Sequence, residues 1–208
     1  MVASVRPRDL CHMESLFVSA GVVAVAEIGD KTQLLTLALA ARYRRVAPIL
    51  LGILLATVAN HGLAAWLGAA VAGWIGPELL RWIVGVSFLA MAAWCLVPDA
   101  ADEGAAESRP GWGPFLATLV GFFLVEIGDK TQIATIALAA RFHDVILVTC
   151  GTTLGILLVN LPAVLLGDVV AQKLPMRLIR AAAAAAFAAL GVLTLWQGAA
   201  LMPGLTAG

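Results

Sequence analysis

Charged residues are scarce in this sequence, and their scarcity excludes most soluble folds. Only 12% of the 208 residues are Asp, Glu, Lys or Arg, whereas 62% are hydrophobic and the mean hydropathy is +0.97. A soluble domain usually has about 25% charged residues. The formal net charge is zero, which gives no support to nucleic acid as a partner. The composition therefore predicts an integral membrane protein.

Cysteine and histidine are also rare, with three of each. Cys11, Cys95 and Cys150 lie far apart in the chain, and no histidine stands near them at the spacing of a zinc site. We therefore predict neither a disulfide framework nor a zinc centre. The first 13 residues lack the separate apolar core of a signal peptide, and we expect them to form a short polar tail.

The hydrophobic residues gather in six long segments. A membrane-spanning helix needs about 20 apolar residues, so we expect an all-α integral membrane protein with six transmembrane helices. The expected helices cover residues 16–41, 46–75, 79–97, 115–140, 145–171 and 178–201. The expected organisation is a polar tail (1–13), a three-helix repeat (14–97), an acidic linker (98–113), a second three-helix repeat (114–201) and a C-terminal tail (202–208).

An internal repeat is the strongest feature of the sequence. The heptapeptide EIGDKTQ occurs at residues 27–33 and again at 126–132, and we call these the first and the second motif. Residues 27–43 and 126–142 agree at 13 of 17 positions at a constant offset of 99. Because each half holds an odd number of expected helices, the second half must enter the membrane from the opposite side. The halves are therefore expected to be inverted repeats, as in many secondary transporters.

Each motif places ionisable groups in the middle of an apolar segment. The four motif acids are Glu27, Asp30, Glu126 and Asp129. A charged side chain at mid-membrane costs roughly 2.5–3.5 kcal/mol on insertion scales. Inverted symmetry can offset this cost, since it can bring both motifs to one central site. With the two motif lysines, Lys31 and Lys130, this site carries a net charge of minus two.

Oxygen donors dominate around these acids. Carboxylates suit Mg²⁺, Ca²⁺ and Mn²⁺ and argue against Cu⁺. We therefore expect the motif acids to bind a divalent cation that is a transported substrate, with no resident cofactor. Exchange of one divalent cation for two protons would keep the site uncharged in both loaded states.

The lysines and threonines of the motifs have two interpretations each. The lysines either orient the carboxylates or extend away into a cavity. On a continuous helix, the acids and the lysine of a motif share one face, and Thr32 and Thr131 point toward a neighbouring helix. If the helices are unwound at Gly29 and Gly128, the threonine hydroxyls could instead join the cation.

Five further polar residues are candidates for supporting roles. Gln33 and Gln132 either supply an amide oxygen to the cation or form a polar contact between helices. Asn60, His61 and Asn160 lie inside the second and fifth expected helices, and the offset of 99 pairs His61 with Asn160. They either line the path of the cation, with His61 relaying protons, or form hydrogen bonds between helices.

Two copies of Glu-x-Gly-Asp-Lys-Thr, each on the first helix of a three-helix repeat, resemble a known transporter family. It is the family of manganese/calcium:proton exchangers of the Golgi, the chloroplast and bacterial plasma membranes, which are related to the calcium:cation antiporters. The resemblance covers essentially the whole chain. It implies Mn²⁺ or Ca²⁺ as substrate, protons as counter-ion and the motif acids as the binding site, with Lys31, Thr32, Lys130 and Thr131 completing the motifs. The short chain resembles a bacterial member that exports Mn²⁺ across the plasma membrane.

The distribution of Lys and Arg predicts the orientation in the membrane. Seven of these residues lie on the side of the central linker and four on the opposite side, which favours a cytoplasmic linker and two external termini. Alternative functions are a six-helix exporter of small organic solutes such as amino acids and a passive divalent-cation channel. An enzyme is disfavoured because the sequence offers no nucleophile and no cofactor motif. The sequence leaves the oligomeric state open.

Overall fold

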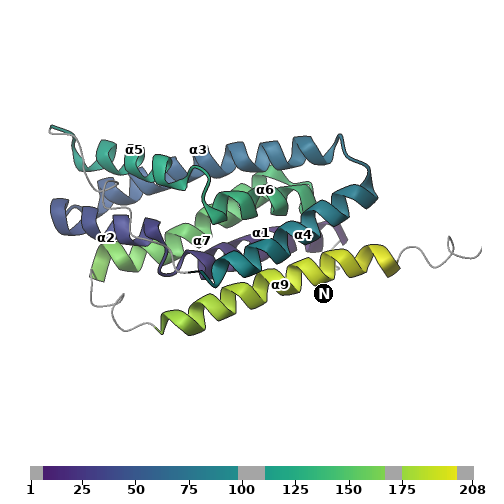
Figure 1. Ribbon diagram of the computed structural model, residues 1–208. Helices are drawn as coiled ribbons and strands as arrows, with labels where there is room; N and C mark the ends of the chain where they lie inside the picture. The colour runs from purple at the N-terminus through teal and green to yellow at the C-terminus, as the bar shows by residue number, and fades with distance from the viewer. Residues whose placement is uncertain (1–6, 98–110, 167–174, 201–208) are drawn as a thin grey trace, which may run out of the picture.

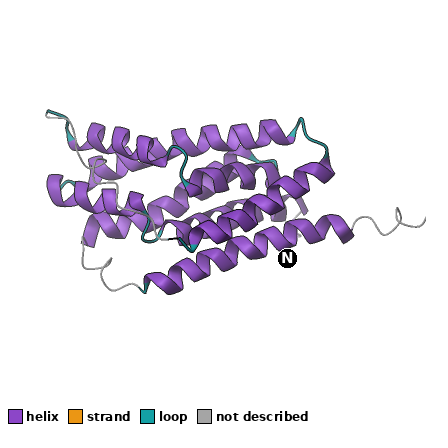
Figure 2. Ribbon diagram, in the orientation of Figure 1, coloured by secondary structure: helices purple, strands orange, loops and turns teal. Residues whose placement is uncertain are grey.

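The computed structural model describes residues 7–97, 111–166 and 175–200, with side chains over 13–97, 111–166 and 175–196, and every regular element in these ranges is an α-helix (Figure 1, Figure 2). The eight described helices are α1 (Pro7–Glu27), α2 (Lys31–Tyr43), α3 (Val46–Ala72), α4 (Pro77–Cys95), α5 (Pro114–Glu126), α6 (Lys130–Phe142), α7 (Val145–Leu166) and α9 (Met176–Ala200). The predicted all-α class is confirmed. The C-terminal tail and most of the acidic linker lie outside the described residues.

Four of the described helices, α3, α4, α7 and α9, are long and apolar enough to cross a membrane. Each of them begins within two residues of its predicted start. The other two predicted helices, 16–41 and 115–140, are not continuous: the first is divided into α1 and α2, and the second into α5 and α6. Of the two alternatives left open by the sequence, the structure thus shows the interrupted helix at both motifs, with breaks at Gly29 and Gly128. In addition, α1 begins at Pro7, inside the predicted polar tail.

A tight turn divides each of the two helices. In the second motif, the N–H of Asp129 donates to the carbonyl of Glu126 at 3.1 Å. Ile127 has φ −64° and ψ 119°, and Gly128 has φ 76°, which are the angles of a type II turn. Its third position requires a positive φ, which glycine adopts without steric cost. The first motif has the same closing hydrogen bond, with Gly29 at φ 77°.

The two divided segments enter the bundle from opposite ends. Figure 1 shows that α1 begins at the end where α9 ends, whereas α5 begins at the other end, beside the turn between α2 and α3. The turns of both motifs therefore lie in the interior of the bundle, between elements that belong to different halves of the chain.

Glycines allow close packing of α1 against α7 and of α5 against α3. A Cβ atom on Gly151 would lie 2.9 Å from Cβ of Ser19, and one on Gly52 would lie 2.7 Å from Cβ of Thr118. The offset of 99 relates Gly52 to Gly151, so both halves use the same contact between small residues. Membrane helices associate through such close backbone contacts because lipid provides no hydrophobic driving force between them.

Helices α4 and α9 form a pair beside this core. Phe88 of α4 stacks on Phe187 of α9 with ring centroids 6.3 Å apart. The offset of 99 relates α4 to α9 and α1 to α5, yet the pair does not contact the two halves equally. Helix α9 packs on α1, before the first turn, whereas α4 packs on α6, after the second turn. The pair is therefore displaced from a symmetric position.

Candidate cation-binding site

The two motifs meet in the interior of the bundle and form one cluster. All four motif acids are buried, with exposed fractions of 0% for Glu27, 1% for Asp30, 0% for Glu126 and 2% for Asp129. The charges of Lys130 and of the three other acids all act on the Glu27 carboxyl. The expectation that the fold brings the two motifs together thus agrees with the structure.

Two crossed ion pairs connect the motifs. Nζ of Lys31 lies 3.1 Å from Oδ1 of Asp129, and Nζ of Lys130 lies 2.5 Å from Oδ1 of Asp30. Each lysine therefore pairs with the aspartate of the other motif, and neither extends away from the site. The turns explain this arrangement, because they separate the acid and the lysine of one motif from the shared face of a continuous helix.

The two glutamates are held in different ways. Oγ1 of Thr32 donates to Oε1 of Glu27 within the first motif. Glu126 is instead contacted from α3, where Nε2 of His61 lies 2.8 Å from its Oε2. Within the part of the chain that the structure describes, Oε2 of Glu27 and Oε1 of Glu126 have no hydrogen-bond partner, although both side chains are fully buried. Buried carboxylate oxygens without partners are costly, and they mark the point at which a ligand would be favourable.

His61 lies between a threonine hydroxyl and a motif acid. Its Nδ1 lies 3.0 Å from the hydroxyl oxygen of Thr135, which also donates to the carbonyl of Thr131 at 2.8 Å. Its Nε2 lies 2.8 Å from Oε2 of Glu126. Both ring nitrogens therefore have a partner, and the tautomer sets which atom of each contact donates.

Asn160 occupies the equivalent position in the other half but makes different contacts. Its Oδ1 accepts from Oγ1 of Thr36 at 2.7 Å, and its Nδ2 donates to the carbonyl of Ile156 at 3.0 Å. Thr36 and Thr135 are related by the offset of 99, so the threonine contact is common to both halves. Only His61 extends the contact to a motif acid.

The motif glutamines stabilise the turns. Oε1 of Gln33 accepts from the N–H of Gly29 at 2.8 Å, and Oε1 of Gln132 accepts from the N–H of Gly128 at the same distance. In addition, the Gln132 amide donates to Oδ1 of Asn60. The glutamine oxygens are therefore used by the backbone.

Asn60 and Thr131 complete the second motif. Nδ2 of Asn60 donates to the carbonyl of Phe123 at 3.2 Å, which ties α3 to α5. Both the N–H and the hydroxyl of Thr131 donate to Oδ2 of Asp129, at 3.2 and 3.1 Å. The structure thus places Asn60 in a hydrogen bond between helices, which was one of the two roles that the sequence suggested for it. It places Thr131 beside the acid of its own motif.

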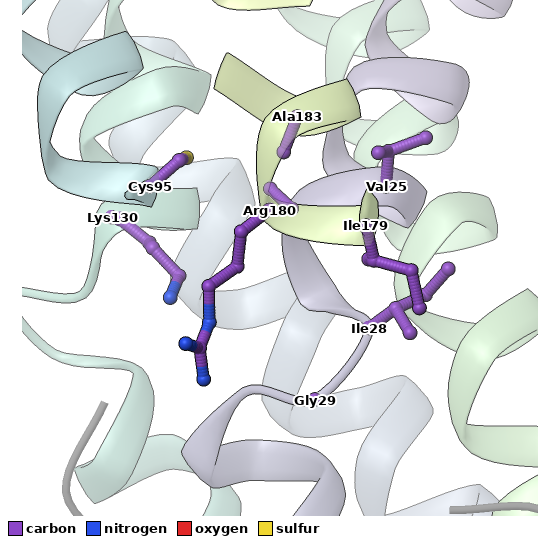
Figure 3. A pocket seen from close by; sticks show the side chains of 9 residues that line it. Val25, Ile28, Gly29, Cys95, Lys130, Ile179, Arg180 and Ala183 are labelled. Carbon is purple, nitrogen blue, oxygen red and sulfur yellow. The ribbon is translucent and has the colours of Figure 1, made fainter. Parts of the chain in front are cut away.

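A small cavity, of about 10 Å³, lies next to the first turn (Figure 3). Lys130 and Arg180 both extend into it, and Gly29 and Cys95 form part of its wall (Figure 3). The end of the Met176 side chain covers Gly29, because a Cβ atom at this glycine would lie 1.5 Å from Cε of Met176. The cavity thus reaches a motif lysine from the side of α9.

Several residues around the site were missed by sequence reasoning. Thr36 and Thr135 lie in the repeated stretch and are identical in both halves, so the repeat itself could have indicated them. Met176 and Arg180 carry no such signal, since only the packing of α9 against α1 brings them to the first turn. Among the described residues, no three His, Cys, Asp or Glu side chains stand together as a metal site.

A bundle of membrane-spanning helices in which two helices are interrupted beside buried acids is typical of secondary transporters. A family model described as "Divalent cation/proton antiporter GDT1" matches residues 15–103 and 114–201. The chain therefore belongs to the GDT1 family of divalent cation/proton antiporters, which confirms the resemblance seen in the motifs.

Individual relatives agree with this family. A protein of Vibrio cholerae named "Putative manganese exporter" is 52% identical over 183 residues, which cover 88% of this chain and 90% of the relative. GDT1-like protein 3 of Oryza sativa subsp. indica is 28% identical over 80% of this chain and 68% of its own length. GDT1-like protein 3 of Arabidopsis thaliana is 28% identical over 80% of this chain and 65% of its own length. No solved structure matches the chain.

Proposed function

We propose that this protein exchanges Mn²⁺ for protons across a bacterial plasma membrane and exports Mn²⁺ from the cytoplasm, with the four motif acids as the binding site. The observation that carries the proposal is a pair of buried carboxylate oxygens, Oε2 of Glu27 and Oε1 of Glu126, that have no hydrogen-bond partner among the described residues. The name of the Vibrio cholerae relative supports manganese as the substrate. Ca²⁺ is the alternative substrate, because it also accepts carboxylate ligands.

The charges of the site match this exchange. Each aspartate is balanced by a lysine of the other motif, so the net charge of minus two resides on Glu27 and Glu126. Two protons, one for each glutamate, neutralise this charge, and so does one divalent cation between them. Exchange of one divalent cation for two protons is therefore electroneutral at the site. Electrogenic exchange in a transport measurement would contradict this stoichiometry.

The crossed ion pairs suggest how the aspartates become available. An ammonium group and a divalent cation compete for the same carboxylate oxygens, so a cation between the glutamates would repel Lys31 and Lys130 from the aspartates. Lys31 has a route away, since its side chain is 25% exposed. Lys130 borders the cavity beside Arg180 (Figure 3). In this proposal, the lysines hold the aspartates until the cation arrives.

The helix pair α4–α9 is the proposed moving element. The offset of 99 and the opposite directions of α1 and α5 support an inverted repeat. Under this symmetry, the contact of α9 with α1 corresponds to a contact of α4 with α5. The contact of α4 with α6 corresponds to one of α9 with α2. A shift of the pair from the first set of contacts to the second would uncover the first turn and cover the second. Transporters with inverted repeats alternate access by such movements.

The proposed orientation places the turn between α2 and α3 in the cytoplasm. Arg42, Arg44 and Arg45 lie at this turn, and Lys and Arg are enriched in cytoplasmic loops. With this orientation, the central linker is cytoplasmic and both termini are external. The cavity beside Gly29 is lined from the first turns of α9, at the end of the bundle that is proposed to be cytoplasmic.

Transport into liposomes tests the proposal. Purified protein is reconstituted with an imposed pH gradient, and Mn²⁺, Ca²⁺ and Mg²⁺ fluxes are compared between the wild type, Glu27→Gln and Glu126→Gln. Loss of a carboxylate ligand should lower coupled Mn²⁺ flux by about a hundredfold or more, since even an outer partner of a metal ligand contributes about 10- to 100-fold. Glu78→Gln is the matched control, because Glu78 is exposed in the first turn of α4.

The same assay separates the alternatives. A passive channel would conduct Mn²⁺ without a pH gradient, whereas an exchanger couples the flux to pH. An exporter of amino acids would move these solutes and show no competition by Mn²⁺. Unchanged coupled flux in both glutamate variants would remove the proposed site.

A further inference from the structure

His61 lies outside both motifs, yet its imidazole contacts a motif acid, Glu126. It belongs to α3, is fully buried, and reaches Glu126 from the side opposite to the motif itself. Asn160, its counterpart in the other half, leaves Glu27 without such a contact. The site is therefore built from identical motifs but has one nitrogen donor at its edge.

We propose that Nε2 of His61 is a direct ligand of the transported cation and biases the site toward Mn²⁺ over Ca²⁺. This inference rests on the proposed function, since it assigns a further ligand to the same site. It adds a residue outside the motifs to the four acids, and it explains selectivity, which the acids alone do not.

The hydrogen bond at the other ring nitrogen supports a ligand role. A histidine that binds a metal usually donates its second N–H to a fixed acceptor, which sets the tautomer and the ring orientation. Nδ1 of His61 lies 3.0 Å from the hydroxyl oxygen of Thr135, and that hydroxyl is itself held by its bond to the carbonyl of Thr131. In the tautomer with a proton on Nδ1, the ring donates to Thr135 and directs the Nε2 lone pair toward Glu126.

The position of the two donor atoms fits neighbouring ligands. Nε2 of His61 and Oε2 of Glu126 are joined by a contact of 2.8 Å. A cation that displaces the proton of this contact would be reached by both atoms with a small movement of the side chains.

The chemistry of the donors points in the same direction. Ca²⁺ is bound almost entirely by oxygen, and selection among cations depends on ligand type and cavity size. An imidazole nitrogen favours first-row transition ions over alkaline-earth ions. A site with four carboxylates would accept both Mn²⁺ and Ca²⁺, and one nitrogen shifts this balance toward Mn²⁺.

A protein with a single histidine gives the sharpest test. The chain has three histidines, so the double variant His12→Asn and His143→Asn leaves His61 as the sole imidazole. His143 is exposed and has φ 53°, a backbone conformation that Asn tolerates well. Mn²⁺ is added to this protein in detergent, and pulsed electron paramagnetic resonance measures coupling of the electron spin to an imidazole nitrogen. Coupling is expected, and its absence from bound Mn²⁺ would overturn the inference.

Transport kinetics provide the second readout. His61→Asn places in the first half the residue that the second half carries as Asn160. We expect this variant to raise the KM for Mn²⁺ by about 10- to 100-fold, with a much smaller change for Ca²⁺. His143→Asn is the matched control and should leave both values unchanged. Equal losses for Mn²⁺ and Ca²⁺ in His61→Asn would show a structural role instead and would contradict the inference.

The two proposals fail in different ways. If the wild type neither binds nor transports Mn²⁺, the proposed function is wrong. If the wild type exchanges Mn²⁺ for protons, but its Mn²⁺ shows no imidazole coupling, the function stands and the role of His61 is wrong. The spectroscopic test needs only the variant that retains His61, so poor folding of His61→Asn leaves the inference testable.

Discussion

The two motifs have the same seven residues but different surroundings. The first turn is covered by α9, with the end of Met176 over Gly29, whereas no atom lies within 4 Å of a Cβ at Gly128. The lysines differ as well, since Lys31 is 25% exposed and Lys130 only 5%. The identical sequence sets the turns and the crossed ion pairs, whereas the neighbouring helices set access and the partners of the glutamates.

This difference shows that asymmetry in the site comes from outside the motifs. The contacts of α4 and α9 are displaced toward one side of the core, and His61 replaces the asparagine of the other half. Equivalent substitutions in the two motifs should therefore have unequal effects, and each pair of variants measures one part of the asymmetry.

Removal of an aspartate should have the largest effect. Asp30→Asn removes the carboxylate that opposes the buried Lys130 ammonium, and breaking a buried ion pair from one side costs roughly 3–5 kcal/mol. Asp129→Asn should cost less, because Lys31 is partly exposed and can reach water. Thermal unfolding in detergent should therefore show a lower midpoint for Asp30→Asn than for Asp129→Asn.

A second substitution controls this comparison. Lys130→Met removes the charge that Asp30→Asn leaves behind, so the double variant should recover much of the lost stability. Equal midpoints for the two aspartate variants, or no recovery in the double variant, would contradict the described difference between the pairs.

Alanine at the turn glycines should have the next largest effect. The positive φ of Gly29 and Gly128 costs an L-residue about 1–2 kcal/mol, and this part should be equal in both motifs. Gly29→Ala should be more destabilising than Gly128→Ala, since it also displaces the end of Met176, at about 0.5–1.5 kcal/mol for a strained side chain. The unfolding midpoints of both glycine variants are measured in the wild-type background and again in a Met176→Ala background. The difference between the two variants should disappear when Met176 is alanine. A difference that persists would show that Met176 is not its cause.

Composition and the repeat predicted the membrane class, the position of the spanning helices and the four motif acids. They left the interruption of two helices at Gly29 and Gly128 as one of two alternatives, because the length and period of an apolar run do not distinguish an interrupted helix from a continuous one. The glycine before the aspartate in each motif was a signal for the turn, since a type II turn needs glycine at its third position. Periodicity could suggest pairs between i and i+4, but not the crossed pairs of Lys31 and Lys130.

Contacts made between distant helices were beyond the sequence. His61 stood in the sequence as one of three polar residues within apolar segments, and only the packing of α3 against α5 and α6 brings it to Glu126. The cover over Gly29 likewise depends on the position of α9. The sequence could thus indicate the turns, which depend on backbone angles, but not the contacts that depend on how distant helices pack.

The motif threonines should show the smallest difference. Thr32 donates to Glu27, whereas the hydroxyl of Thr131 donates to Asp129, which also keeps a bond to the Thr131 N–H. A single hydrogen bond contributes about 0.5–1.5 kcal/mol. Thr32→Val should therefore raise the KM for Mn²⁺ in liposomes several-fold, and Thr131→Val should raise it less, because His61 still holds Glu126.

Valine keeps the volume of threonine, so the two variants differ from the wild type only in the lost hydroxyl. Thr149→Val is the control, since that hydroxyl donates only to the carbonyl of Val145 within α7, and its KM should match the wild type. A larger effect of Thr131→Val than of Thr32→Val would mean that the second threonine, and not the first, supports a glutamate during transport. The partners of Glu27 and Glu126 would then exchange between the halves as access alternates, which is the behaviour expected if the asymmetry belongs to one stage of the cycle and not to the sequence.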